Sequence, residues 1–187
     1  MTDPPLASSP ASRHEWIACI DGGSRGNPGP AGYGVVIQDA AGKTLATLSR
    51  SIGKATNNVA EYHALLAALE YGLERKTSRL RVYCDSELIV RQMQGRYRVK
   101  SPDLLPLHQR ARELAGRLER FSIQHVPREQ NSEADRLANQ AMDQAQSPAP
   151  APVRSLLAVC ENGLLRPLSP VPELEEGAEY EVRLRKR

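Results

Sequence analysis

The chain has 187 residues, of which 40% are hydrophobic and 25% charged, and its formal net charge is +3. These values are those of a globular protein and exclude a disordered chain, and no apolar run approaches the ~20 residues that cross a bilayer. The small positive charge permits a nucleic-acid partner but does not require one.

The chain opens with residues 1–14, which carry three prolines and no apolar segment typical of a signal peptide. We therefore expect a disordered leader and a cytoplasmic protein. The three cysteines lack metal-binding spacing, and Cys19 and Cys84 fall in apolar strand patterns, so we expect free thiols.

Residues 15–52 predict an antiparallel meander of three strands, because apolar runs alternate with tight turns. The strands are expected at Trp16–Asp21, Tyr33–Gln38 and Thr44–Ile52. Beyond the meander, helices and strands alternate. Helices are expected at about 58–74, 86–94, 102–117 and 132–146, and strands at 80–84 and 121–126. This order predicts an α/β fold whose first three strands are antiparallel and whose later strands enter the sheet through right-handed crossovers.

The sequence after the last helix suggests a second, smaller unit. Residues 146–152 (QSPAPAP) are typical of a linker, so the main domain is expected to span residues 15–145 and a β-rich unit residues 153–187. Asn162-Gly163 between apolar runs predicts a type I′ hairpin, and Tyr180–Leu184 a further strand. Because so short a unit buries little surface, we expect it to form a homodimer or to dock on the rest of the chain.

Four acids lie where strands end or helices begin, which is where sites of α/β proteins usually form. Asp21 and Asp85 each close an apolar strand, Glu61 lies in the first turns of a helix, and Asp135 opens another helix. Converging carboxylates repel one another unless cations neutralise them, and hard oxygen ligands favour Mg²⁺ or Mn²⁺. Two such ions would activate a water on one side of a phosphate and stabilise the leaving oxygen on the other, which is phosphodiester hydrolysis.

Each acid also has a purely structural interpretation. Asp135 follows Ser132 by three residues and can complete a capping box, while Asp85 can favour a helix start through the helix dipole. Asp21 can form a turn, and Glu61 can be a partly solvated helix residue. Taken singly, the four residues leave both interpretations open.

Four segments in order resemble type 1 ribonuclease H, close to the compact branch of bacteria and archaea, and the resemblance covers Trp16–Gln144. The segments are IDGGSRGNPGPAGYG, ATNNVAEYHALLAAL, VYCDSELIV and HVPREQNSEADRLAN. The resemblance implies a mixed five-stranded sheet flanked by helices. It also implies endonucleolytic, two-metal cleavage of the RNA strand in RNA/DNA hybrids, which leaves 3′-hydroxyl and 5′-phosphate ends.

The resemblance further implies a role for each catalytic residue. The four acids fall on the family's metal-binding positions: Asp21 would contact both ions, Glu61 and Asp85 would hold the ion that activates water, and Asp135 would complete the second site. Arg128 resembles an arginine that compact members place before the last acid, and it would act on the scissile or leaving phosphate.

Seven further positions match residues that bind the hybrid in the family: Gly22, Gly23, Ser24, Asn27, Thr56, Asn57 and Asn58. The three asparagine amides would read 2′-hydroxyls and base edges in the minor groove. Backbone amides beside the two glycines would approach the RNA, and the threonine would contact a DNA phosphate. Only residues 95–100 (GRYRVK) remain of the long basic segment that grips hybrid in some relatives, so weaker binding is expected.

The tail is similar to a family of small β-rich antitoxins through AVCENGLLRPLSPV and EEGAEYEVRL. Two alternatives to a hybrid ribonuclease therefore stay open at this point. One is a hybrid-binding or regulatory module with negligible turnover, whose biological role the tail supplies. The other is a different nuclease of the same fold, such as a resolvase or a transposase-like enzyme.

Overall fold

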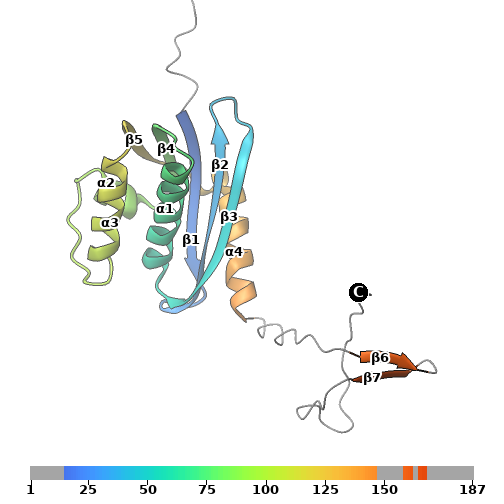
Figure 1. Ribbon diagram of the computed structural model, residues 1–187. Helices are drawn as coiled ribbons and strands as arrows, with labels where there is room; N and C mark the ends of the chain where they lie inside the picture. The colour runs from blue at the N-terminus through green and yellow to red at the C-terminus, as the bar shows by residue number, and fades with distance from the viewer. Residues whose placement is uncertain (1–14, 147–157, 162–163, 168–187) are drawn as a thin grey trace, which may run out of the picture. The chain divides into compact units, whose positions relative to one another are not determined.

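The computed structural model describes residues 15–146, 158–161 and 164–167 (Figure 1). Five of its strands form one mixed sheet in the order β3-β2-β1-β4-β5. The strands are β1 (Glu15–Ser24), β2 (Gly29–Asp39), β3 (Thr44–Ala55), β4 (Arg79–Cys84) and β5 (Arg120–His125). Strands β1, β2 and β3 pair antiparallel, while β4 pairs parallel with both β1 and β5. The predicted fold class is thus confirmed.

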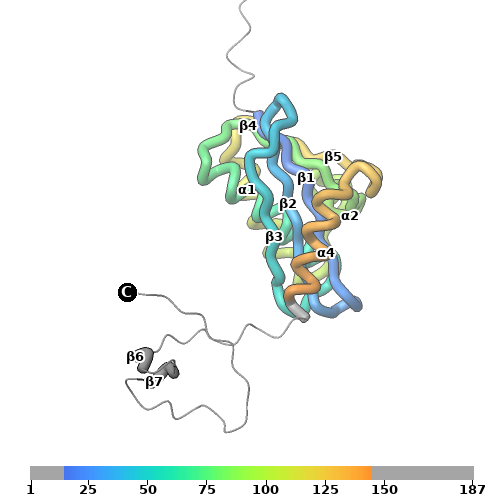
Figure 2. The backbone as a smooth tube through the Cα atoms, turned by 90° about the vertical axis from the view of Figure 1, so that its right-hand side faces the viewer, coloured from blue at the N-terminus to red at the C-terminus, as the bar shows by residue number. Residues whose placement is uncertain are grey.

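Helices cover both faces of this sheet. They are α1 (Asn57–Glu74), α2 (Glu87–Met93), α3 (Leu105–Gly116) and α4 (Ser132–Gln146), and a short 3-10 helix spans Arg128–Gln130. Helix α1 packs on β1 with α3 beside it, and α4 packs on β2, β3 and β1. Figure 2 shows α1 and α4 on opposite sides of the sheet. The main core lies between the sheet and α1, with Ile20, Leu65, Leu69 and Val82 among its buried residues.

Two glycines let these helices lie directly against the strands. A Cβ added to Gly22 of β1 would lie 2.3 Å from the carbonyl carbon of Ala60 in α1, and one added to Gly34 of β2 would lie 2.3 Å from the carbonyl oxygen of Ala134 in α4. Backbone therefore packs on backbone at both places. This close approach fixes the start of each helix relative to the end of β1.

The strands of the meander are longer than predicted, because the glycine-rich segment between them is mostly paired. Strand β1 continues to Ser24 and β2 begins at Gly29, so that Gly22 lies opposite Tyr33. The first strand was expected to end at Asp21, but Gly22 and Gly23 continue it, and Gly22 makes the contact with α1 just described. Helix α3 begins at Leu105 rather than residue 102, and the proline of its first turn is Pro106.

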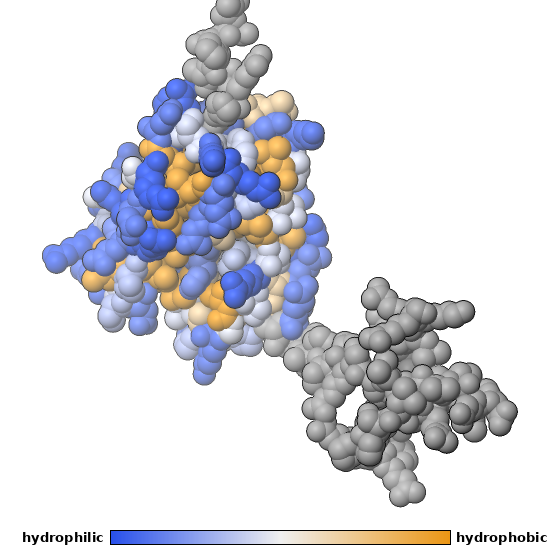
Figure 3. All heavy atoms as spheres, in the orientation of Figure 1, coloured by the Kyte–Doolittle hydropathy of each residue, from blue (hydrophilic) through white to orange (hydrophobic). Residues whose placement is uncertain are grey.

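Hydrophobic groups on the face shown in Figure 3 lie between hydrophilic residues. Among the described residues the exposed large hydrophobic side chains are Leu45, Tyr97 and Leu105. No helix in the described part of the chain is long and apolar enough to span a membrane.

The chain divides into two units, residues 1–148 and residues 149–187. In the second unit β6 (Ala158–Glu161) pairs antiparallel with β7 (Leu164–Pro167), on either side of Asn162-Gly163, as the predicted hairpin requires. The expected leader, most of the linker and the strand at Tyr180–Leu184 lie outside the described residues.

Candidate active site

The four predicted acids, Asp21, Glu61, Asp85 and Asp135, line one pocket. It lies where β4 ends: β4 pairs with β1 only as far as Ile20, so Asp21 has no strand beside it on that side. The other residues that line the pocket are Gly22, Gly23, Asn57, Arg128, Asn139 and Met142.

The acids reach this pocket from both faces of the sheet. Side chains alternate along a strand, and a Cβ at Gly22 would meet α1 whereas one at Gly23 would meet Met142 of α4. Asp21 therefore belongs to the α4 face, while Glu61 comes from α1. The two carboxylates interact because β4 stops before it would separate them.

Burial and mutual repulsion hold protons on two of the acids. Burial, then the charges of Asp85 and Asp135, raise the pKa of Asp21 to about 7, against the opposing charge of Arg128. Burial raises the pKa of Glu61 to about 8, although a hydrogen bond with the Ser86 side chain favours its charged form. Without cations, the pocket thus avoids carrying four negative charges near neutral pH.

These shifts predict a pH-dependent stability of the metal-free protein. The folded-state pKa values of Asp21 and Glu61, about 7 and about 8, exceed their ordinary values of 3.8 and 4.5. Their contribution to stability is therefore complete below the ordinary values and is lost as the pH rises through the folded-state values. In thermal unfolding with EDTA from about pH 4 to 9, Asp21→Asn and Glu61→Gln should lose less Tm with rising pH than the wild type. Parallel profiles of all three proteins would contradict this.

Both carboxylate oxygens of Asp135 are hydrogen-bonded within the protein. The Arg128 guanidinium donates to Oδ1, and Asn139 Nδ2 donates to Oδ2 at 3.1 Å. The Arg128 side chain is 70% exposed, whereas that of Asp135 is 24% exposed. Among the described residues, no group of three or more His, Cys, Asp or Glu side chains is arranged to hold a metal ion. In this arrangement Asp135 is held by Arg128 and Asn139.

Asn131 is a site residue that the sequence interpretation missed. The residue is 1% exposed, and its Nδ2 donates to the Ile20 carbonyl at 2.8 Å and to Asp85 Oδ1 at 3.3 Å. It thereby fills the gap beyond β4 and ties Asp85 to the end of β1. In the sequence Asn131 is only the residue before Ser132, and no local pattern marks it as a site residue. Asn139, also missed, had a usable signal, since it lies one helical turn after Asp135.

Asn57 joins three parts of the site. Its backbone N–H donates to Asn27 Oδ1 at 3.1 Å, its Oδ1 accepts from the Ser24 N–H at 3.2 Å, and its Nδ2 donates to Glu61 Oε1 at 3.2 Å. The Asn58 side chain makes no hydrogen bond within the described part of the chain. Two of the three asparagines predicted to bind substrate are thus already engaged internally.

Two other predicted substrate-binding residues also have structural roles. Thr56 caps α1, and its Oγ1 accepts from the Val59 N–H at 3.4 Å. Helix α1 fills the side-chain position of Gly22, so close helix packing by itself requires a glycine there. Their contacts with nucleic acid stay predictions.

Because Asn57 forms these hydrogen bonds and Asn58 does not, we expect alanine substitutions of the two residues to change different kinetic constants. Asn57→Ala removes the donor to Glu61, so we expect kcat to fall about tenfold through misplacement of that carboxylate. Asn58→Ala leaves these bonds intact and should mainly raise KM for the hybrid substrate that the sequence predicts. Steady-state cleavage and thermal unfolding of both variants test this, and equal changes in kcat would show that Asn57 does not position Glu61.

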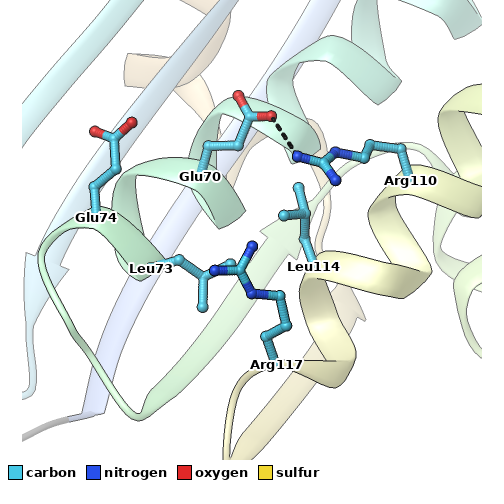
Figure 4. A pocket seen from close by; sticks show the side chains of 6 residues that line it. All are labelled: Glu70, Leu73, Glu74, Arg110, Leu114 and Arg117. Carbon is cyan, nitrogen blue, oxygen red and sulfur yellow. Dashed lines mark ion pairs between the residues drawn. The ribbon is translucent and has the colours of Figure 1, made fainter.

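A second hollow, between α1 and α3, is shown in Figure 4. Its lining residues are Glu70, Leu73, Glu74, Arg110, Leu114 and Arg117. Two acids and two arginines balance in charge, and Arg110 lies 4.0 Å from Glu70. Exposed pairs of this kind contribute little to stability or binding. The candidate active site is therefore the pocket at the end of β4.

A mixed sheet in this order, with four acids gathered where β4 ends, defines a ribonuclease H-like domain. Residues 20–141 match the Reverse transcriptase-like family, and the chain belongs to that family. The match ends before the tail, so the resemblance of residues 153–187 to antitoxins stays a prediction.

Curated relatives include the Bifunctional protein Rv2228c of Mycobacterium tuberculosis, which is 52% identical over 132 residues, covering 70% of this chain and 36% of that protein. Ribonuclease HI of Halobacterium salinarum is 45% identical over 128 residues, covering 68% of this chain and 64% of that protein. The chain thus spans about a third of the length of the mycobacterial relative.

Solved ribonuclease H structures have a similar fold. The N-terminal RNase H domain of the mycobacterial protein superposes with a TM-score of 0.70 at 50% identity, over 72% of this chain and 99% of that chain. LC11-RNase H1, solved in complex with an RNA/DNA hybrid, superposes with a TM-score of 0.67 at 47% identity, over 71% of this chain and 99% of that chain.

Proposed function

We propose that this domain is an endonuclease that hydrolyses the RNA strand of RNA/DNA hybrids and leaves 3′-hydroxyl and 5′-phosphate ends. The observation that carries the proposal is the convergence of Asp21, Glu61, Asp85 and Asp135 in one pocket. The likeness to LC11-RNase H1, whose structure contains such a hybrid, supports the choice of substrate.

The chemistry of the pocket fits two divalent cations. Four carboxylates offer the hard oxygen ligands that Mg²⁺ and Mn²⁺ prefer. Burial first, and neighbouring negative charges after it, raise the pKa values of Asp21 and Glu61, so their ionised forms need positive charge nearby, which cations would supply. Asp21 would hold both ions, Glu61 and Asp85 one of them, and Asp135 the other. Bound ions supply an activated water and stabilise the leaving oxygen.

The remaining residues of the site bind and orient the hybrid in this proposal. Arg128 contacts the scissile or leaving phosphate through its guanidinium. Asn58, with its uncommitted amide, reads 2′-hydroxyls in the minor groove, assisted by Asn27 and Asn57. Thr56 contacts a DNA phosphate, and the N–H groups of residues 22–24 approach the RNA strand.

The test is cleavage of an end-labelled RNA/DNA hybrid by the full chain, with Mg²⁺ or Mn²⁺ and with EDTA. We expect metal-dependent cutting of the RNA strand alone. Binding of hybrid without cutting would identify a regulatory module. Preferential cutting of duplex RNA, duplex DNA or a four-way junction would identify another nuclease of the same fold.

The free thiols of Cys19 and Cys84 support a reducing compartment, and we propose the cytoplasm. For residues 153–187 the small size of the unit supports dimerisation or docking, and light scattering of the full chain distinguishes a dimer from a monomer.

A further inference from the structure

Arg128 puts a positive charge into a pocket that is otherwise lined by acids and neutral residues. Its guanidinium donates to Asp135 Oδ1, and Asn139 holds the other oxygen. Each oxygen thus already accepts one hydrogen bond, so a divalent cation at Asp135 would either share an oxygen with a donor or take the place of that donor. Sharing Oδ1 would bring the cation close to the guanidinium charge, which favours departure of a donor.

The two donors differ in how easily they withdraw. Asn139 lies on α4 one turn after Asp135, and its Nδ2 also donates to the Asp135 carbonyl at 2.9 Å. Arg128 belongs to the separate 3-10 helix Arg128–Gln130, and its side chain is 70% exposed. Water can solvate an exposed guanidinium, so Arg128 would withdraw more easily than Asn139.

The charge of Arg128 acts on the whole acidic cluster. It lowers the pKa of Asp21 against the larger effects that raise it. In turn Asp135, first through its hydrogen bond and then through its charge, raises the pKa of the guanidinium, and Asp21 and Asp85 add to this effect. Arg128 therefore supplies part of the positive charge that the cluster requires when no metal ion is bound.

We infer that Arg128 is an internal counter-ion, which holds Asp135 in the metal-free protein and competes with the divalent cation that binds there. This inference rests on the proposed function. Two cations cannot share one carboxylate at close range without repulsion, so binding of the ion displaces the guanidinium. The displaced guanidinium is then available to a phosphate of the hybrid, so that ion binding prepares Arg128 for the substrate.

The test measures cation binding without hybrid, by calorimetric titration of the full chain with Mn²⁺ and with Mg²⁺. Arg128→Ala should bind the cation at Asp135 about three- to tenfold more tightly than the wild type, because its competitor is gone. The matched control is Arg25→Ala, which removes the same charge and also breaks an arginine–aspartate pair with α4, at Asp143 outside the pocket. The control should bind the cation as the wild type does.

A second measurement follows the side chain itself. In the wild type, Mg²⁺ should shift the NMR signal of the Arg128 Nε–H group toward its position in Asp135→Asn, where the pair is already broken. Equal cation affinity of Arg128→Ala and Arg25→Ala, or weaker binding by Arg128→Ala, would overturn the inference and leave the proposed function standing. A wild type that binds no divalent cation would overturn the inference, and it would overturn the proposed function as well only if it also failed to cleave hybrid in the presence of the cation.

Discussion

Asp85→Asn is expected to lose hybrid-cleaving activity by a factor on the order of a thousand while keeping its fold. The substitution exchanges a charged, two-oxygen ligand for a neutral amide with one oxygen, which is a poor partner for Mg²⁺. The fold survives because the remaining oxygen still accepts from Asn131 Nδ2, as Asp85 Oδ1 does at 3.3 Å. Single-turnover cleavage of a labelled hybrid measures the loss, and thermal unfolding verifies the fold.

The control for this experiment is Asp143→Asn. Asp143 is also an acid close to a strand end, but it pairs with Arg25 and does not line the pocket. It lies eight residues after Asp135 on α4, about 12 Å along the helix axis. We expect its activity to stay within a few-fold of the wild type. If Asp85→Asn kept a tenth or more of the activity, Asp85 would not be a metal ligand.

Gly22→Ala is expected to destabilise the protein by about 3 kcal/mol or more, because no space exists for the added carbon. The new Cβ would lie 2.3 Å from both the carbonyl carbon of Ala60 and the backbone nitrogen of Glu61. Since these atoms belong to the helix backbone, no side chain can swing aside, and α1 must shift. The shift would carry Glu61 away from Asp21, so activity should fall together with stability in urea unfolding.

Gly116→Ala is the control for Gly22→Ala, because the same substitution is made at a glycine with free space around it. Gly116 ends α3, and no atom lies within 4 Å of the Cβ that would be added there. Alanine in a helix is favoured over glycine, so this variant should gain about 0.4–1 kcal/mol. A Gly22→Ala protein as stable as wild type would mean that α1 does not lie against β1 as described.

The sequence was sufficient for those features that depend on local pattern. Apolar runs that end in Asp21 and Asp85 predicted both the strands and the acids, and the residues of α4, Ser132–Gln146, were predicted without error. The end of the first strand was predicted too early, at Asp21, because a glycine that makes a turn and a glycine that admits a helix look alike in one sequence.

Features that depend on tertiary contacts were beyond sequence reasoning. Nothing local distinguishes a buried Asn131 from a capping residue, although its amide holds Asp85 in place. Asn57 of α1 forms hydrogen bonds with Asn27 and Ser24, which precede it in the sequence by 30 residues or more. The pairing of Arg128 with Asp135 was also not predicted, and the predicted contact of Arg128 with a phosphate stays a prediction.

The early end of β4 also limits how this domain can change in evolution. Asp85 reaches the pocket because the strand before it has a fixed length and its side chains alternate between the faces. One inserted or deleted residue in Arg79–Cys84 would turn Asp85 to the opposite side, away from its neighbours. Substitutions in this strand are tolerable as long as the core is filled, but changes of length are not, so this stretch should accept new residues far more readily than gaps.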